Sequence, residues 1–190
     1  MKPRIIFILL ILYYMDFFET VEKRYSHKER FLPSPVPLSD LEIIAKAGLT
    51  APTGTNSQCV RLIILPDREA LQPLCDVSPT EGLRTAPAAI AVLTDISSQK
   101  SEWNFEVEDY SAAASQMLLA VTALGYVSVW LDSPYFDEGK QKAALKILGA
   151  PAGYHLRVVL PVGLPDGEGS RRGKMAFEER VSYRKFGNCR

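Results

Sequence analysis

Positively charged side chains cluster near both ends of this 190-residue chain. Arg24 and Lys28 flank Ser26 in the first cluster, and Arg172 and Lys174 stand in the second. Guanidinium and ammonium groups, together with hydroxyl donors, are the side chains that bind a phosphate group. Taken singly, each cation is better explained as a solvated surface charge, because most Arg and Lys side chains are exposed. If the fold brings the clusters together, they predict a phosphate site.

A turn of small polar residues lies between the two clusters. It has the sequence Ala51-Pro52-Thr53-Gly54-Thr55-Asn56-Ser57-Gln58 and is followed by an apolar run. Such a loop has little side-chain bulk and many hydrogen-bonding groups, which suits a polyol-linked ring. A phosphate, a polyol and a flat ring together describe flavin mononucleotide (FMN). Asn56 has a competing explanation, because asparagine commonly closes turns.

The composition argues against several other kinds of site. Basic and acidic residues number 22 each, so no nucleic-acid partner is predicted. Three widely spaced cysteines and two histidines predict neither a disulfide framework nor a metal site. A reducing, cytoplasmic location fits this cysteine usage best. The stretch 167–173 is glycine-rich but does not join a strand to a helix, so it is not a dinucleotide fingerprint.

Residues 1–14 form an apolar extension. Lys2 and Arg4 precede an apolar stretch that is shorter than the ~20 residues needed to span a bilayer. No small-residue cleavage site follows it, whereas Asp16 and Glu19 suit the start of a first helix. The extension is therefore a misassigned start or a weak anchor, and a membrane partner is not expected. Residues 15–190 are predicted to form a single domain.

Apolar spacing and capping residues predict helices along the chain. The first would bury Phe17, Phe18 and Val21, and a Ser39–Glu42 capping box would begin the second. Gly125 would end the longest one. The predicted helices cover Asp16–Lys23, a segment from Ser39 to about Gly48, Asp67 to near Pro73, Val107–Leu124, Asp137–Leu148 and Phe177–Val181.

Short β-branched and apolar runs predict four strands. They cover Val60–Leu65, Ala88–Thr94, Tyr126–Leu131 and Leu156–Leu160. The second is continuously apolar, as in an interior strand covered on both faces. Because helices and strands intermix and no repeat is present, we expect one sheet with helices packed on both faces.

At four points the sequence resembles the FMN-dependent nitroreductase family, along nearly the whole chain from Met15 to Phe186. The order and spacing of these motifs carry the resemblance. They are Arg24-Tyr25-Ser26-His27-Lys28, the turn Ala51–Gln58, Ala123-Leu124-Gly125-Tyr126, and Arg172-Gly173-Lys174-Met175-Ala176-Phe177-Glu178-Glu179. Tyr25 and the pair Cys59-Val60 depart from the residues that are usual in the family.

The resemblance implies an α+β fold of three layers, α/β/α, with a mixed central sheet, built as an intertwined homodimer with FMN in the interface. The implied FMN residues fall into three groups. Arg24, Tyr25, Ser26, Lys28, Arg172 and Lys174 would meet the phosphate and ribityl chain; Thr53, Gly54 and Asn56 would reach the flavin of the neighbouring subunit; and Leu131, Asp132 and Ser133 would lie near flavin N5 and O4.

The implied activity is hydride transfer from NADH or NADPH, through flavin N5, to a small, flat, electron-poor acceptor such as a nitroaromatic, a quinone or a flavin. The cofactor carries this chemistry, so no catalytic side chain is required. Trp103 and Phe105 are candidates to cover the substrate face, although aromatic packing explains them equally well. Two alternatives stay open: an FMN carrier or sensor with little turnover, and an electron-transfer partner tethered to a membrane through residues 2–14.

Overall fold

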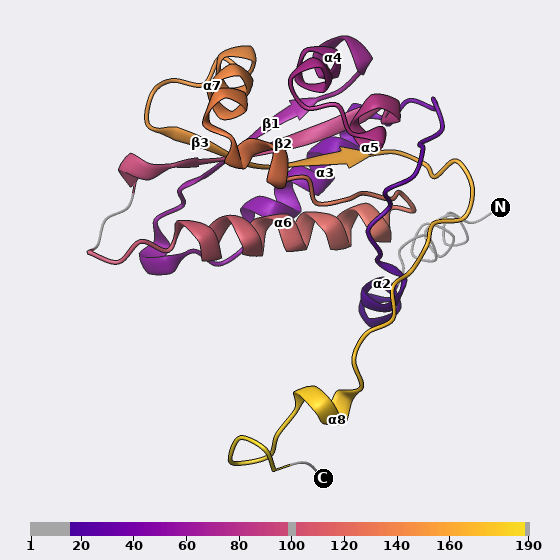
Figure 1. Ribbon diagram of the computed structural model, residues 1–190, viewed down its shortest axis with the longest axis vertical. Coiled ribbons are helices and arrows are strands. Elements are labelled where there is room, and N and C mark those ends of the chain that lie inside the picture. Colours follow the sequence, from indigo (N-terminus) through magenta and orange to yellow (C-terminus); the bar gives the residue numbers. More distant parts are fainter. Residues whose placement is uncertain (1–15, 99–101, 189–190) are drawn as a thin grey trace, which may run out of the picture.

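A three-stranded sheet lies between two layers of helices (Figure 1). The computed structural model describes residues 16–98 and 102–188, so the prediction for residues 1–14 lies outside the described residues. The strands β1 (Val60–Leu65), β2 (Ala88–Asp95) and β3 (Tyr154–Val162) pair antiparallel in the order β1-β2-β3. A parallel pairing is present at the isolated bridge between Ser26 and Ser128. The three-layer α+β arrangement agrees with the fold predicted from the sequence.

The central strand β2 is buried on both faces, as its apolar run predicted. Side chains alternate between the two faces of a strand, so β2 supplies both halves of the core. Ala88, Ile90 and Val92 belong to the core cluster on one face of the sheet, whereas Ala89, Ala91 and Leu93 belong to the core cluster on the other face. Strand β1 is an edge strand, and its middle residues are accordingly part-exposed.

Helices α3 (Leu38–Leu49) and α6 (Glu106–Ala123) cover one face of the sheet (Figure 1). The residues predicted at helical spacing in α3, from Leu41 to Gly48, are buried there. Gly125 follows α6 with φ of 84°, the left-handed conformation that ends many helices. The capping box predicted at Ser39 was wrong. The helix begins one residue earlier, after Pro37, and no side chain caps it.

Helices α4 (Arg68–Val77), α5 (Glu81–Thr85) and α7 (Glu138–Ile147) cover the opposite face (Figure 1). The predicted end of α4 near Pro73 was wrong, and α5 was not predicted. Proline removes only one backbone donor from α4, and the buried side chains of Leu71 and Leu74 hold the helix on either side of it. Tertiary packing therefore outweighs the local cost of the proline.

Helix α2 (Phe17–Lys23) has the predicted cap, because Asp16 accepts a hydrogen bond from the Phe18 N–H at 2.9 Å. The predicted burial of its apolar residues was wrong. Phe17 is 63% exposed, Phe18 is 73% exposed, and Val21 is also exposed, whereas Thr20 is the buried residue. The helix turns its threonine toward the body of the chain and leaves its aromatic face uncovered.

The segment predicted as a strand at 126–131 makes only isolated bridges, from Val127 to Gly163, from Ser128 to Ser26 and from Leu131 to Val159. Strand β3 runs through Pro161, which has no N–H to donate, so a continuous ladder does not form on this side. Beyond β3, the C-terminal arm (residues 167–188) leads away from the layers and carries α8 (Phe177–Arg180) (Figure 1). No described helix has the length and apolar character needed to cross a membrane.

Candidate functional site

The two basic clusters meet in one pocket of about 460 Å³, the anion pocket. Residues at and after the end of α2 form one side, and the C-terminal arm forms the other. The lining includes the residues predicted to hold the phosphate and ribityl chain: Arg24, Tyr25, Ser26, Lys28, Arg172 and Lys174. The structure thus brings together segments from both ends of the chain. The cofactor contacts of these residues remain predictions.

Among the described residues, five basic side chains line the anion pocket against one acidic side chain, that of Glu22. Within residues 16–98 and 102–188, none of the cations Arg24, Lys28, Arg172 and Lys174 forms an ion pair with a carboxylate. The neighbouring Lys23, in contrast, lies 2.6 Å from Glu19. Several like charges gathered in one concave site attract an anion, so the pocket fits a phosphate group.

One basic residue in this pocket was not singled out from the sequence. Arg171 donates hydrogen bonds to the carbonyls of Glu22 at 2.9 Å and Lys23 at 2.6 Å. Its guanidinium also lies over the Tyr25 ring, 5.1 Å from the ring centroid. No sequence signal separates Arg171 from Arg172 beside it, because the difference lies entirely in their tertiary contacts.

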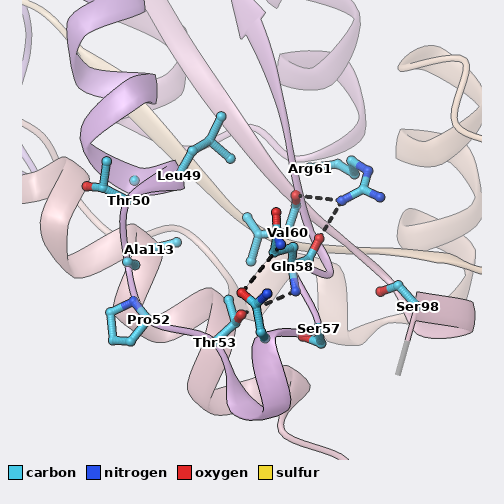
Figure 2. A pocket seen from close by; sticks show the side chains of 13 residues that line it. Leu49, Thr50, Pro52, Thr53, Ser57, Gln58, Val60, Arg61, Ser98 and Ala113 are labelled. Carbon is cyan, nitrogen blue, oxygen red and sulfur yellow. Dashed lines mark hydrogen bonds between the residues drawn. The ribbon is translucent and has the colours of Figure 1, made fainter. Parts of the chain in front are cut away.

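The predicted ring-binding turn lines a different cavity, of about 940 Å³ (Figure 2). Thr53 and Asn56 are part of this lining. The backbone of Gly54 packs directly on Phe105, since a Cβ at Gly54 would lie 2.3 Å from the ring. Within one chain, the residues predicted for the phosphate and those predicted for the ring therefore do not share a cavity.

The turn holds several residues in the left-handed backbone region. Thr55, Asn56 and Gln58 have φ of 51°, 55° and 50°. This conformation is rare for residues other than glycine and especially unfavourable for a β-branched threonine. The Asn56 carboxamide oxygen accepts a hydrogen bond from the Gln58 side chain at 3.3 Å. Asn56 therefore helps to close the turn, and such strain is typical of functional loops that the surrounding structure fixes.

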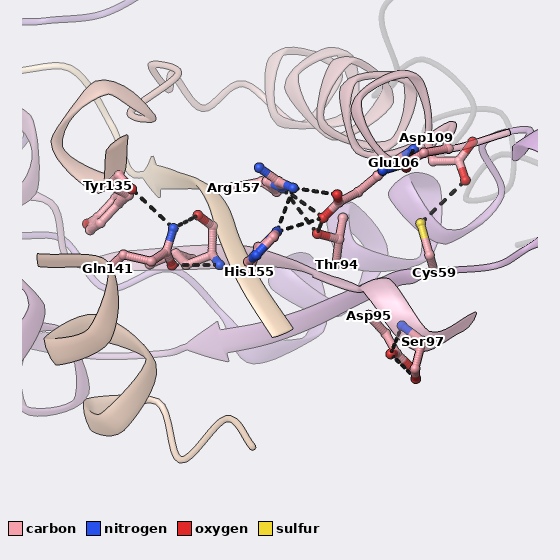
Figure 3. A network of polar contacts seen from close by, with 12 residues as sticks. Cys59, Thr94, Asp95, Ser97, Glu106, Asp109, Tyr135, Gln141, His155 and Arg157 are labelled. Atoms are coloured by element: carbon pink, nitrogen blue, oxygen red, sulfur yellow. Dashed lines mark hydrogen bonds and ion pairs between the residues drawn. The ribbon is translucent and has the colours of Figure 1, made fainter. Parts of the chain in front are cut away.

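Asp109 of α6 fixes this turn. The carboxylate is 2% exposed and accepts hydrogen bonds from the Gly54 N–H at 2.7 Å and the Ser57 hydroxyl at 2.6 Å. The thiol of Cys59 donates to it at 3.3 Å (Figure 3). Burial, together with the nearby carboxylate, raises the pKa of the Cys59 thiol to about 11. Cys59 is thus a buried, protonated side chain that packs in the core.

A second polar network ties the start of α6 to the sheet (Figure 3). Glu106 is 4% exposed and forms an ion pair with Arg157 of β3 at 2.5 Å. Thr94 donates a hydrogen bond to the same carboxylate, and His155 Nδ1 lies 3.2 Å from it. The guanidinium of Arg157 also lies over the ring of Tyr110. His155 therefore has a structural role, as a member of this network.

The other predicted cofactor residues lie in neither cavity. The backbone N–H of Leu131 donates to the Val159 carbonyl at 3.2 Å, so this donor is already used within the chain. The Asp132 carboxylate accepts a hydrogen bond from the Trp130 indole at 2.8 Å, and Ser133 begins a short 3-10 helix. Of the two predicted substrate aromatics, Trp103 is 70% exposed. Phe105 packs on Gly54, which favours the packing explanation for its ring.

Comparisons with known proteins bear on the family and the fold of this chain. The sequence profile of the nitroreductase family matches residues 21–79 and 76–164. A protein of Archaeoglobus fulgidus, provisionally named NADH dehydrogenase/NAD(P)H nitroreductase, is 36% identical over 130 residues, which are 68% of this chain and 74% of that protein. A solved FMN-dependent nitroreductase of Clostridium difficile superposes with a TM-score of 0.76 at 24% identity, over 88% of this chain and 98% of that one. A provisionally named nitroreductase of Desulfovibrio desulfuricans, solved in complex with FMN, superposes with a TM-score of 0.78 at 23% identity, over 90% of this chain and 98% of that one.

Proposed function

Because this chain belongs to the nitroreductase family, we propose that it is an FMN-dependent oxidoreductase that takes a hydride from NADH or NADPH and passes it to a small, flat, electron-poor acceptor. A nitroaromatic, a quinone or a flavin has the required chemistry. The observation that carries this proposal is the anion pocket, where Arg24, Lys28, Arg172 and Lys174 from both ends of the chain form no ion pair with any carboxylate that the structure describes. Both described thiols, Cys59 and Cys75, are free, which supports a reducing, cytoplasmic location.

The chain's own residues bind and orient the cofactor. Bound FMN supplies the hydride chemistry at its ring. The anion pocket would hold the phosphate through Arg24, Lys28, Arg172 and Lys174, with the Ser26 hydroxyl as a further donor. The backbone bridge from Ser26 to Ser128 keeps this segment extended against the body of the protein. No acid or base is needed among these residues, because their task is to fix the position of a charged group.

The charge reversal Lys174→Glu tests the phosphate assignment. A charge-assisted phosphate contact contributes about 1.5–3 kcal/mol, so the Kd for FMN should rise roughly 10- to 100-fold. Riboflavin, which has no phosphate, should bind as it does to the wild type. Titrations that follow the visible flavin absorbance measure both values.

The matched control is Lys142→Glu, the same change at an exposed position of α7, on the outer helix layer. Its FMN and riboflavin affinities should both equal those of the wild type. An FMN affinity that is unchanged in Lys174→Glu would show that the phosphate binds elsewhere.

We further propose that the protein is a homodimer in which the phosphate and the ring are held by different subunits. Two observations support this assembly. Large apolar side chains are uncovered on α2 and on the C-terminal arm, where Phe177 is 59% exposed and Phe186 is fully exposed. In addition, the predicted phosphate and ring residues line separate cavities of one chain. Light scattering should give twice the 21.1 kDa chain mass, and a monomeric FMN-bound protein would contradict the proposal.

A carrier with little turnover is the second candidate. The connection between β2 and α6 is short, and its Trp103 is largely exposed, so this part of the chain offers little cover for a reacting ring. Stopped-flow mixing of the FMN-bound protein with NADPH, and separately with NADH, distinguishes the candidates. Rapid loss of the flavin absorbance supports the enzyme, and a persistent yellow colour supports the carrier.

A further inference from the structure

We propose that Arg171 is a positioning residue that fastens the C-terminal arm to the end of α2. It thereby holds Arg172 and Lys174 beside Arg24 and Lys28 before any anion binds. The inference rests on the proposed function only in taking the anion to be the phosphate of FMN. The contacts of Arg171 with the end of α2 are present in the protein without its cofactor.

The hydrogen bonds of Arg171 go to backbone atoms that need donors. Glu22 and Lys23 lie in the last turn of α2, where carbonyls have no partner within the helix. The two terminal nitrogens of Arg171 each donate to one of these carbonyls, at 2.9 Å and 2.6 Å. A cation at this end of a helix also interacts favourably with the helix dipole. A planar guanidinium presents a separate nitrogen to each carbonyl in a rigid fork, whereas a lysine ammonium offers one nitrogen on a flexible stem.

The residues before Arg171 fit the same surface. Gly169 lies so close to Tyr25 that a Cβ would come within 2.1 Å of the ring, so a side chain at this position would push the arm away. The Ser170 hydroxyl donates to the Glu29 carboxylate at 3.3 Å. Three successive residues therefore contact the segment 22–29. Within the glycine-rich stretch that does not fit a dinucleotide fingerprint, Gly169 is thus explained by its close approach to an aromatic ring.

The anion pocket needs such a fastening because its other cations repel one another. Arg172 and Lys174 make no hydrogen bond or ion pair through their side chains within the described residues, so the contacts of residues 169–171 must oppose this repulsion, and Arg171 makes the shortest hydrogen bonds among them. Arg171 uses its own charge on carbonyls and on the Tyr25 ring, neither of which depends on a ligand. A site that is assembled in advance binds its ligand more tightly, because less ordering is required at the moment of binding.

Two variants distinguish positioning of the arm by Arg171 from a direct effect of its positive charge on the ligand. Arg171→Lys keeps the charge, and Arg171→Gln removes it. If Arg171 acts by position, both should raise the Kd for FMN by about tenfold and to a similar extent, and both should leave riboflavin binding unchanged. Arg84→Lys and Arg84→Gln are the matched controls. Arg84 is exposed and makes no side-chain hydrogen bond or ion pair among the described residues.

A second readout uses the protein without cofactor. Trypsin cleaves after Lys23, at the peptide bond whose carbonyl accepts a hydrogen bond from Arg171. Both Arg171 variants should therefore be cleaved at this bond several-fold faster than the wild type and the Arg84 variants. The fragments are followed by mass spectrometry.

The outcomes separate this inference from the proposed function. Wild-type FMN affinity in Arg171→Lys, with weaker binding only in Arg171→Gln, would overturn positioning in favour of charge alone. If Lys174→Glu weakens FMN binding while both Arg171 variants match the wild type, the phosphate site stands and the fastening is refuted. If the wild type binds no FMN, the proposed function fails. In that case cleavage after Lys23 decides: faster cleavage in both variants supports the fastening, and equal cleavage overturns it.

Discussion

Asp109→Ala should lower the free energy of unfolding by about 3 kcal/mol and weaken the binding of FMN and riboflavin alike. The buried carboxylate accepts its two shortest hydrogen bonds from the Gly54 N–H and the Ser57 hydroxyl. Alanine would leave both donors without an acceptor. Each charge-assisted bond of this kind stabilises by about 1.5–3 kcal/mol.

The flavin affinity should fall because the same carboxylate holds a strained turn. Without it, Thr55 and Asn56 can leave the left-handed region, where each residue costs roughly 1–3 kcal/mol. The predicted ring contacts would then lose their positions. Riboflavin and FMN should be affected by the same factor, about tenfold for each 1.4 kcal/mol, since the phosphate is not involved.

Glu108→Ala is the matched control for Asp109→Ala. Glu108 lies in the same first turn of α6 but is exposed to solvent. Denaturant unfolding and flavin titrations measure the two effects separately. Equal riboflavin affinity in the wild type and in Asp109→Ala would show that this turn does not contact the ring.

Arg157→Met is expected to destabilise the protein by about 3 kcal/mol at neutral pH. The change would leave the Glu106 carboxylate buried without its cation, and breaking a buried ion pair in this way costs about 3–5 kcal/mol. The lower end applies because the Arg157 side chain is 23% exposed and its charge is partly solvated. Thermal or denaturant unfolding measures the loss.

The cost of Arg157→Met should depend on pH. Burial by itself would raise the pKa of Glu106, but the hydrogen bonds from Arg157 and Thr94 outweigh burial and hold this pKa below its ordinary value of 4.5. A carboxyl whose pKa is depressed by folding stabilises the native state above its unfolded pKa. This stabilisation is lost as the pH falls through the folded pKa. The stability difference between wild type and Arg157→Met should therefore shrink as the pH is lowered to about 4.

The control for this series is Arg84→Met, which removes an exposed arginine and should change stability little at either pH. Glu106→Gln combined with Arg157→Met should be less destabilised than Arg157→Met alone, because no buried charge is left without a partner. A stability difference that stays the same at both pH values would refute the role of the Glu106 charge.

Local periodicity made much of the interior predictable. In α3 the apolar spacing that favours a helix also marks its buried face, so Leu41 and Ile44 could be assigned to the core before their neighbours were known. The continuous apolar run of β2 marked an interior strand for the same reason. The convergence of the two basic clusters followed from the chemistry that binds a phosphate.

Residues whose role depends on distant contacts escaped prediction. An acidic residue in the first turn of a helix already has an explanation in the helix dipole, so nothing local distinguishes Asp109 from the exposed Glu108. Arg171 stands beside Arg172 and differs from it only in the carbonyls that it reaches. For α2, the sequence marked an apolar face correctly, but the body of the chain packs against Thr20 on another side.

The anion pocket and the hydrophobic interior draw on different parts of the chain. Every buried residue of the two core clusters precedes residue 163, whereas Arg171, Arg172 and Lys174 follow it. None of these three side chains belongs to the core clusters. Substitutions in the arm can therefore alter ligand preference without disturbing interior packing, so the two properties are free to diverge independently during evolution.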